Sequence, residues 1–225
     1  MKKFSPLLIV TAATLWGTMG LFTRKMTELG FSTLQLVFMR ASLTAAILFI
    51  YLIIFDREKL KIKLKDVWIF ILAALISVVL FQHCYTNAIM AGSISIAATL
   101  LYTSPIFVTI ISAILFKEKI TPIKVIALVT AFTGCVLVSG ITGSGTSLTT
   151  TALFLGIASG FTYGLYSIFT KIGLRYYSPL TFTFYTFLIA SVALIPLSDV
   201  SSMTAVTASS VKVAVMPAVF GIVTS

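Results

Sequence analysis

The chain has 225 residues, of which 59% are apolar and only 10% are charged. The chain has a mean hydropathy of +1.11. This value comes close to excluding a soluble enzyme, a disordered protein and a secreted domain stabilised by disulfides. The net charge of +10 would suit nucleic acid, but the placement of the basic residues along the chain favours a membrane.

Seven apolar segments are long enough to cross a hydrocarbon core of ~30 Å as helices. In chain order they cover residues 4–23, 33–55, 67–91, 93–116, 122–141, 152–176 and 179–197. An eighth segment begins near Val211 and reaches Ser225 after about 22 Å of helix, which is short of a full crossing. We therefore predict an all-α, polytopic transmembrane bundle with about seven and a half helices present.

The basic residues predict how these helices are oriented. Twelve lysines and arginines fall on one side of the membrane: before the first segment, between the second and third, between the fourth and fifth, and at the end of the sixth. Only Arg24, Lys25 and Lys212 fall on the other side. By the positive-inside rule, the N-terminus is cytoplasmic and the protein is multi-pass in the plasma (inner) membrane, with its basic residues facing anionic lipid.

Part of the sequence recurs after five helices. Trp16-Gly17 returns as Tyr163-Gly164, and Phe22-Thr23-Arg24 returns as Phe169-Thr170-Lys171, both 147 residues later. Because five is odd, the second copy starts on the opposite side of the membrane, which is the inverted-repeat plan of many secondary transporters. We predict a first repeat over residues 4–141, a linker over 142–151 and an incomplete second repeat over 152–225. Two complete repeats would contain ten helices.

The order of several motifs points to a known family. Trp16-Gly17 lies in the first segment and Arg40 in the second. The fourth holds Tyr102-Thr103-Ser104-Pro105 and runs into Phe116-Lys117-Glu118, and Gly134 lies in the fifth. This order resembles the EamA-type members of the drug/metabolite transporter superfamily, over the first repeat and about half of the second. The resemblance implies a ten-helix importer or exporter of small metabolites with a central cavity between its halves.

Four side chains share one predicted depth. Trp16, Arg40, His83 and Tyr102 each lie about seven or eight residues from the outer end of their segment, or roughly 10–12 Å below the outer surface. This layer would hold one cation, one imidazole and two aromatic rings. Such a set of side chains is expected at the floor of a cavity. Polar groups inside a bilayer are costly and indicate a pathway or site by default.

Arg40 is the strongest of these signals. All six acidic residues of the chain fall at segment ends or in loops, so no carboxylate is expected inside the membrane beside this guanidinium. A fixed cation there favours a solute that carries a carboxylate or a phosphate. The alternative is that Arg40 extends to the outer headgroups and has only a structural role.

The other candidates also have two interpretations. His83 and Asn87 are four residues apart and share a helical face. His83, the chain's only histidine, can titrate during transport, since a free imidazole has a pKa near 6.5. Alternatively, it is a neutral side chain that is hydrogen-bonded to another helix. Tyr102 and Tyr166 contact the solute or simply pack. Pro105 frees the carbonyl of Leu101, either for a ligand or as a plain kink.

We predict an integral membrane transporter that moves a small anionic or zwitterionic metabolite, such as an amino acid, by alternating access. The substrate-binding residues would be Arg40, His83, Asn87, Trp16, Tyr102 and Tyr166. Because no phosphate loop, zinc spacing or catalytic carboxylate pair is present, we expect no enzyme activity, metal or cofactor. The expected partners are the solute and the lipid bilayer, with a homodimer left open and nucleic acid excluded. The alternative is a non-transporting structural or regulatory membrane subunit, or an inactive transporter fragment.

Overall fold

The computed structural model describes residues 26–139, 149–199 and Met203, and all regular elements within them are helices. Five stretches are long and apolar enough to cross a membrane: Thr33–Phe55, Leu64–Ala91, Ile94–Phe116, Thr150–Gly173 and Pro179–Leu197. Helix α7, Pro122–Ser139, is apolar but shorter. These helices confirm the prediction of an all-α polytopic membrane protein. The segments expected at 4–23 and 211–225 lie outside the described residues.

The chain divides into two compact units, residues 1–61 with 183–225 and residues 62–182, here called unit 1 and unit 2. This division differs from the boundaries predicted for the two sequence repeats. It reflects which helices touch one another, whereas the repeat is a property of sequence and orientation. The repeat boundaries therefore stay a prediction.

Unit 1 is organised by helix α2, Thr33–Phe55. Ser32 and Gln35 form a capping box at its start, in which each side chain accepts a hydrogen bond from the other's backbone N–H. The Gln35 side chain also donates to the carbonyl of Asp199 at 3.3 Å. Near the other end, the Phe49 ring stacks on Phe184 with 5.8 Å between centroids. The cap thus fixes where α2 begins. Aromatic packing holds its far end against the part of helix α9, Pro179–Leu194, that belongs to this unit.

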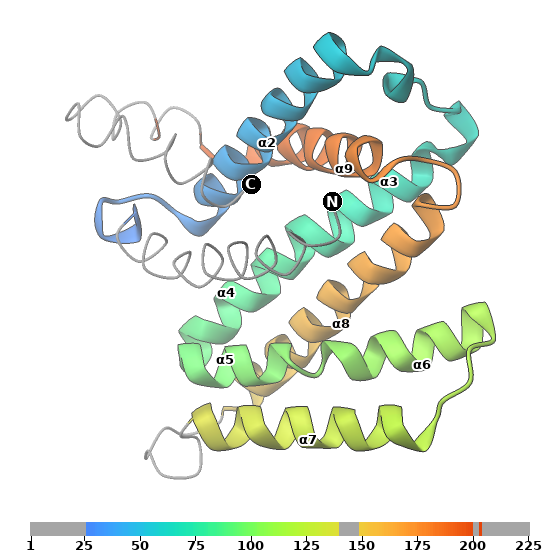
Figure 1. Ribbon diagram of the computed structural model, residues 1–225. Helices are drawn as coiled ribbons and strands as arrows, with labels where there is room; N and C mark the ends of the chain where they lie inside the picture. The colour runs from blue at the N-terminus through green and yellow to red at the C-terminus, as the bar shows by residue number, and fades with distance from the viewer. Residues whose placement is uncertain (1–25, 140–148, 200–202, 204–225) are drawn as a thin grey trace, which may run out of the picture. The chain divides into compact units, whose positions relative to one another are not determined.

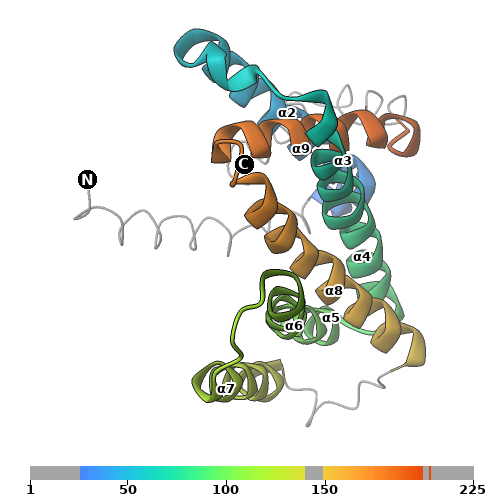
Figure 2. The ribbon, with the colours of Figure 1, turned by 90° about the vertical axis from the view of Figure 1, so that its right-hand side faces the viewer.

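Unit 2 is built around helix α8, Thr150–Gly173, which contacts α3, η3, α4, α5 and α6 (Figures 1 and 2). The third predicted segment forms one continuous rod of α3 (Val67–Ala74), η3 (Leu75–Leu80) and α4 (Phe81–Ala91). Its middle part, η3, is π-helical rather than α-helical. The apolar run is long enough to predict the span, but the wider turn in its middle is invisible in hydropathy.

The fourth predicted segment spans the membrane as expected, but it is not one helix. Helix α5 covers Ile94–Leu101 and helix α6 covers Ser104–Phe116. The interpretation of Pro105 as a residue inside a continuous helix is therefore wrong. The chain breaks at Tyr102–Thr103, and Pro105 lies in the first turn of α6, where a helix does not need the N–H that proline lacks.

A tyrosine ties two loops of unit 2 together. The Tyr177 hydroxyl donates to a carboxylate oxygen of Asp66 at 2.7 Å and accepts from the backbone N–H of Lys63 at 3.1 Å. Its ring lies 5.3 Å from that of Phe70. Burial, followed by the hydrogen bond to Asp66, raises the pKa of Tyr177, so the hydroxyl keeps its proton and remains a donor at neutral pH.

We expect Tyr177→Phe to destabilise the protein by about 1–2 kcal/mol, because the ring packing survives while the Asp66 carboxylate and the Lys63 N–H lose their partner. Thermal unfolding of the purified protein in detergent measures the change. Tyr176→Phe is the matched control, since the Tyr176 side chain is 68% exposed, and it should leave the melting temperature unchanged. Equal effects at the two positions would contradict the role given to the Tyr177 hydroxyl.

The ends of α6, α7 and α8 meet at a charged corner. Lys117, with φ of 55°, ends α6 in the left-handed conformation. Glu118 then forms ion pairs with Lys171 of α8 and Lys124 of α7. The Lys171 ammonium also lies 4.2 Å from the centre of the Phe116 ring. Glu118 thus joins the ends of three helices of unit 2 through ion pairs.

The Glu118 pairs should make stability depend on pH in one direction. The hydrogen bond and charge of Lys171 lower the pKa of Glu118 below its usual 4.5. A carboxyl whose pKa is lowered on folding stabilises the native state above its unfolded pKa and loses this effect as the pH falls through the folded pKa. Wild type should therefore melt slightly higher than Glu118→Gln at pH 7, with the gap closing below pH 4.5. A gap that widened on acidification would contradict this assignment.

Candidate functional site

Helix α4 carries a polar stripe inside a membrane-spanning segment. With 3.6 residues per turn, Gln82, His83, Thr86 and Asn87 fall on one side of this helix. Cys84 and Ala88 fall on the opposite side and are buried. The polar stripe therefore points away from the packed face of α4.

The hydrogen bonds within the stripe do not use the imidazole of His83, so that this side chain can bind a ligand. The Gln82 side chain donates to the Thr86 hydroxyl at 3.3 Å, and the Asn87 amide donates to the backbone carbonyl of His83 at 2.7 Å. The His83 side chain itself is exposed. Asn87 and Thr86 are half-buried, so the stripe offers one uncovered imidazole beside amide and hydroxyl groups that are held in place by their own helix.

An aromatic cluster occupies the other side of α4. The Phe81 ring stacks on Tyr85 at 5.8 Å and lies 5.3 Å from the Tyr163 ring of α8. This side of α4 is thus held by ring contacts within the helix and with α8.

The α5–α6 break lies directly against glycines of α8. A Cβ atom built on Gly160 would come within 2.9 Å of the Leu100 carbonyl oxygen and would also overlap the Thr103 hydroxyl. One turn further along α8, a Cβ on Gly164 would lie 3.1 Å from the Ser104 carbonyl oxygen. Only glycine at position 160 lets the backbone of the break approach this closely.

The structure describes five of the six predicted site residues, four in unit 2 and one in unit 1. His83 and Asn87 share the α4 stripe, as expected. Tyr102, which is 56% exposed, caps α5. The Tyr166 ring lies 6.1 Å from the Phe182 ring. Arg40 is half-buried in α2 of unit 1, and Trp16 lies outside the described residues. The set as a whole stays a prediction.

The sequence interpretation missed two features of this region. One is the glycine repeat Gly156, Gly160 and Gly164, whose four-residue spacing is the known signal for close helix contact in membranes. The other is the π-helical η3, a kind of irregularity that is frequent at functional sites but for which no sequence signal was available.

Comparison with known proteins gives a consistent result along the chain. Residues 3–140 and 150–225 match the model of the EamA-like transporter family. A crystal structure of another protein superposes with a TM-score of 0.65 at 18% sequence identity, covering 84% of this chain and 66% of the other. At that identity the similarity shows the fold alone.

Two relatives come from Archaeoglobus fulgidus, and each is described only as an uncharacterized transporter. One is 27% identical over 197 residues, which cover 86% of this chain and 66% of the relative. The other is 32% identical over 104 residues, or 46% of this chain and 36% of the relative. The chain thus aligns with less than two thirds of the length of either relative.

Proposed function

Because the chain belongs to the EamA-like transporter family, we propose that it moves a small anionic or zwitterionic metabolite, such as an amino acid, across the plasma membrane by alternating access. The observation that carries this proposal is the uncovered polar stripe of α4 within a membrane span. The basic residues support a cytoplasmic N-terminus.

The cost of polar groups in lipid supports a solute path along the stripe. An imidazole and an amide facing hydrocarbon would be expensive, and such groups in membrane proteins face a water-filled cavity or a polar partner. His83 is exposed and Asn87 is half-buried. In the proposed transporter these two residues hydrogen-bond the solute, and the protonation of His83 couples to its movement.

Arg40 supports the charge assigned to the solute. It lies within the span of α2 and is half-buried, and guanidinium groups in such places commonly bind carboxylates or phosphates. In the proposed site, Arg40 attracts the anionic end of the solute. Trp16, Tyr102 and Tyr166 contact its apolar parts in one or other of the alternating states.

The irregular helices of unit 2 support the alternating-access part of the proposal. Broken helices near the middle of the membrane are typical of secondary transporters, where unwound backbone lines the substrate path. Here the α5–α6 break at Tyr102–Thr103 and the π-helical η3 both lie in spans that pack on α8. In the proposed cycle, these two spans bend at their irregular turns while they stay packed on α8.

Uptake into proteoliposomes by the full-length protein tests the proposal. We would measure a panel of amino acids and other small carboxylates against a panel of organic cations, at several pH values, with protein-free vesicles as the blank. His83→Gln should flatten the pH dependence of uptake. Thr130→Val is the control, because Thr130 is also an exposed polar residue on an apolar helix, where it donates to its own Ile126 carbonyl at 2.8 Å.

Each result has a defined meaning. Uptake of carboxylates above the blank, with a pH profile changed by His83→Gln and not by Thr130→Val, would support the proposal. A panel that yields only cation uptake would overturn the assigned solute class. An unchanged pH profile in His83→Gln would remove the histidine from the coupling mechanism.

A further inference from the structure

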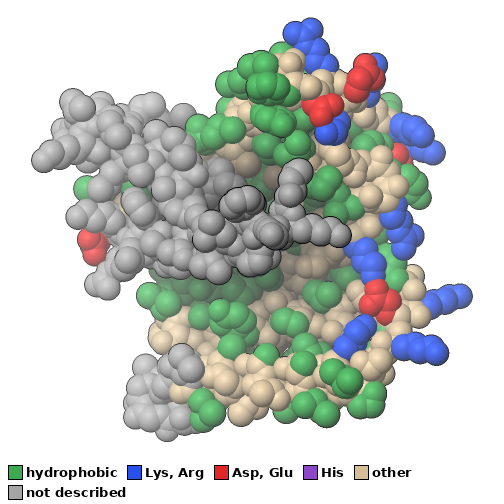
Figure 3. All heavy atoms as spheres, in the orientation of Figure 1, with side chains coloured by type: hydrophobic (Ala, Val, Ile, Leu, Met, Phe, Trp, Pro, Cys, Tyr) green, Lys and Arg blue, Asp and Glu red, His purple; other side chains and the backbone are tan. Residues whose placement is uncertain are grey.

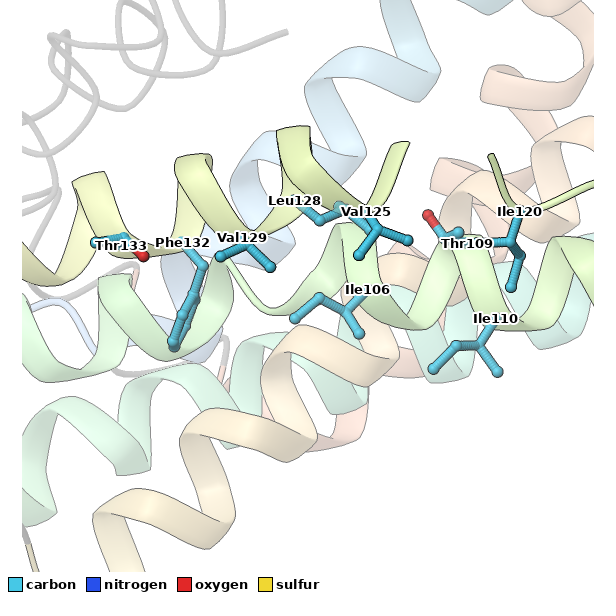
Figure 4. A pocket seen from close by; sticks show the side chains of 9 residues that line it. All are labelled: Ile106, Thr109, Ile110, Ile120, Val125, Leu128, Val129, Phe132 and Thr133. Carbon is cyan, nitrogen blue, oxygen red and sulfur yellow. The ribbon is translucent and has the colours of Figure 1, made fainter. Parts of the chain in front are cut away.

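Helices α6 and α7 of unit 2 leave an apolar groove between them. It has a volume of about 330 Å³ and is lined by Ile106, Ile110, Ile120, Val125, Val129 and Phe132, among others (Figure 4). This volume is at the small end of the range of ligand sites, ~300–1,000 Å³. The lining is almost entirely hydrocarbon, so the groove suits an apolar chain rather than a polar solute.

The groove lies beside a helix with little covering. On α7, Ile123 is 79% exposed, Ile126 is 65% exposed and the groove residue Val129 is 61% exposed. In a membrane-spanning protein, apolar side chains exposed in this way face lipid tails. A groove bordered by them is accessible to an acyl chain from the bilayer.

One end of the groove is strongly basic. Ile120, in the loop between α6 and α7, lines the groove directly after Lys119, and Val125 lines it directly after Lys124. The Lys124 ammonium lies 3.4 Å from the Lys119 carbonyl oxygen and 3.5 Å from a Glu118 carboxylate oxygen. The Lys124 ammonium is therefore held beside the loop whose Ile120 lines this end of the groove.

The charge at this end is not balanced by the single carboxylate. Glu118 is ion-paired with Lys124 and Lys171, and this corner holds three further basic residues, which are its sequence neighbours Lys117 and Lys119 and the Arg175 that lies over the Phe116 ring. Basic side chains gather visibly where α6 runs into α7 (Figure 3). The corner keeps a net positive charge of four, which attracts a negatively charged group placed at the membrane surface.

We propose that this groove binds an anionic phospholipid, with one acyl chain between α6 and α7 and the phosphate held by Lys119 and Lys124. The continuity of an apolar groove with a cationic end matches the two parts of such a lipid. A free phosphate would use only the lysines. A second copy of this chain would place the same cations opposite one another across a symmetric interface, which is unfavourable.

Photo-crosslinking tests this site in the full-length protein, reconstituted in nanodiscs of phosphatidylcholine. The discs would contain a trace of either phosphatidylglycerol or phosphatidylcholine with a diazirine in one acyl chain. Mass spectrometry would then locate the labelled peptides. We expect labelling of α6 and α7 groove peptides to be stronger with the anionic probe than with the neutral one.

Two variants separate the headgroup site from the groove. Lys119→Gln with Lys124→Gln should reduce the preference for the anionic probe, by roughly fivefold for each lysine. The control is Lys59→Gln with Lys61→Gln, a pair that also includes ion-paired lysines at a helix end, and it should keep the preference. Val129→Trp fills the groove and should reduce labelling by both probes.

If something other than an anionic phospholipid occupies the groove, the experiment gives a different result. Each of these results would overturn the proposal. Equal labelling by the two probes in wild type would mean that the groove takes any lipid. Loss of the preference on adding soluble glycerol phosphate would mean that the lysines bind a free anion. Absence of groove labelling with both probes, or labelling unaffected by Val129→Trp, would mean that protein covers the groove or that it stays empty of lipid.

Discussion

Gly160→Ala is expected to destabilise the protein by about 2 kcal/mol, because the added methyl group has no room. It would lie 2.9 Å from the Leu100 carbonyl oxygen, and a backbone atom cannot move aside as the end of a flexible side chain can. Either α8 separates from the α5–α6 break or the break itself changes shape. Chemical or thermal unfolding in detergent measures the loss.

Gly134→Ala provides the matched control for this substitution. Gly134 lies in the interior of α7, and a Cβ atom built there meets nothing within 4 Å. The same change should therefore be neutral or stabilise the protein by roughly 0.5–1 kcal/mol, since alanine is the better helix former. If the two variants moved stability in the same direction by similar amounts, the close packing of α8 on the break would not be what requires glycine at position 160.

Arg40→Gln is expected to reduce the apparent affinity for a carboxylate solute by roughly 10- to 100-fold, the size of one lost charge-assisted hydrogen bond. This prediction rests on the proposed function. The substitution keeps a polar hydrogen-bonding side chain on α2 but removes the positive charge and shortens the side chain. Concentration-dependent uptake into proteoliposomes gives the KM, and size-exclusion chromatography checks that the variant is folded.

Arg57→Gln is the control for the loss of an arginine. Arg57 follows the same helix, is exposed, and its Nε donates to the Ile53 carbonyl at 2.7 Å. It lies beyond the span of α2, so its removal should leave KM unchanged. A KM for Arg40→Gln within twofold of the wild-type value would exclude Arg40 from the solute site, even if the protein proved to be a transporter.

The positions of the spans could be predicted from the sequence with good precision. The segment expected at 33–55 is α2 as observed, and the segments expected at 67–91 and 93–116 have their counterparts within a few residues. Hydropathy suffices because an apolar run of that length has only one inexpensive conformation in lipid, a helix that satisfies its own backbone. Motif order along these spans also led to the family, which the family model confirms.

The candidate site was predicted in part. The four-residue spacing of His83 and Asn87 correctly placed them on one face of α4, because helical periodicity depends only on local geometry. The shared site inferred from the equal depth of His83 and Tyr102 on two different helices stays a prediction. Depth along a segment says nothing about the direction in which a side chain points around its helix.

The sequence by itself determined that this is a helical membrane protein, where its spans lie and which residues can share a helical face, since each of these follows from the chain's local chemistry in lipid. Only the tertiary structure decided that α5 and α6 are separate helices, that Gly160 lies against their break, and that Tyr166 packs on Phe182. Such features depend on which surfaces of distant segments meet. That choice is made by the packing of whole helices and is not encoded in any single segment.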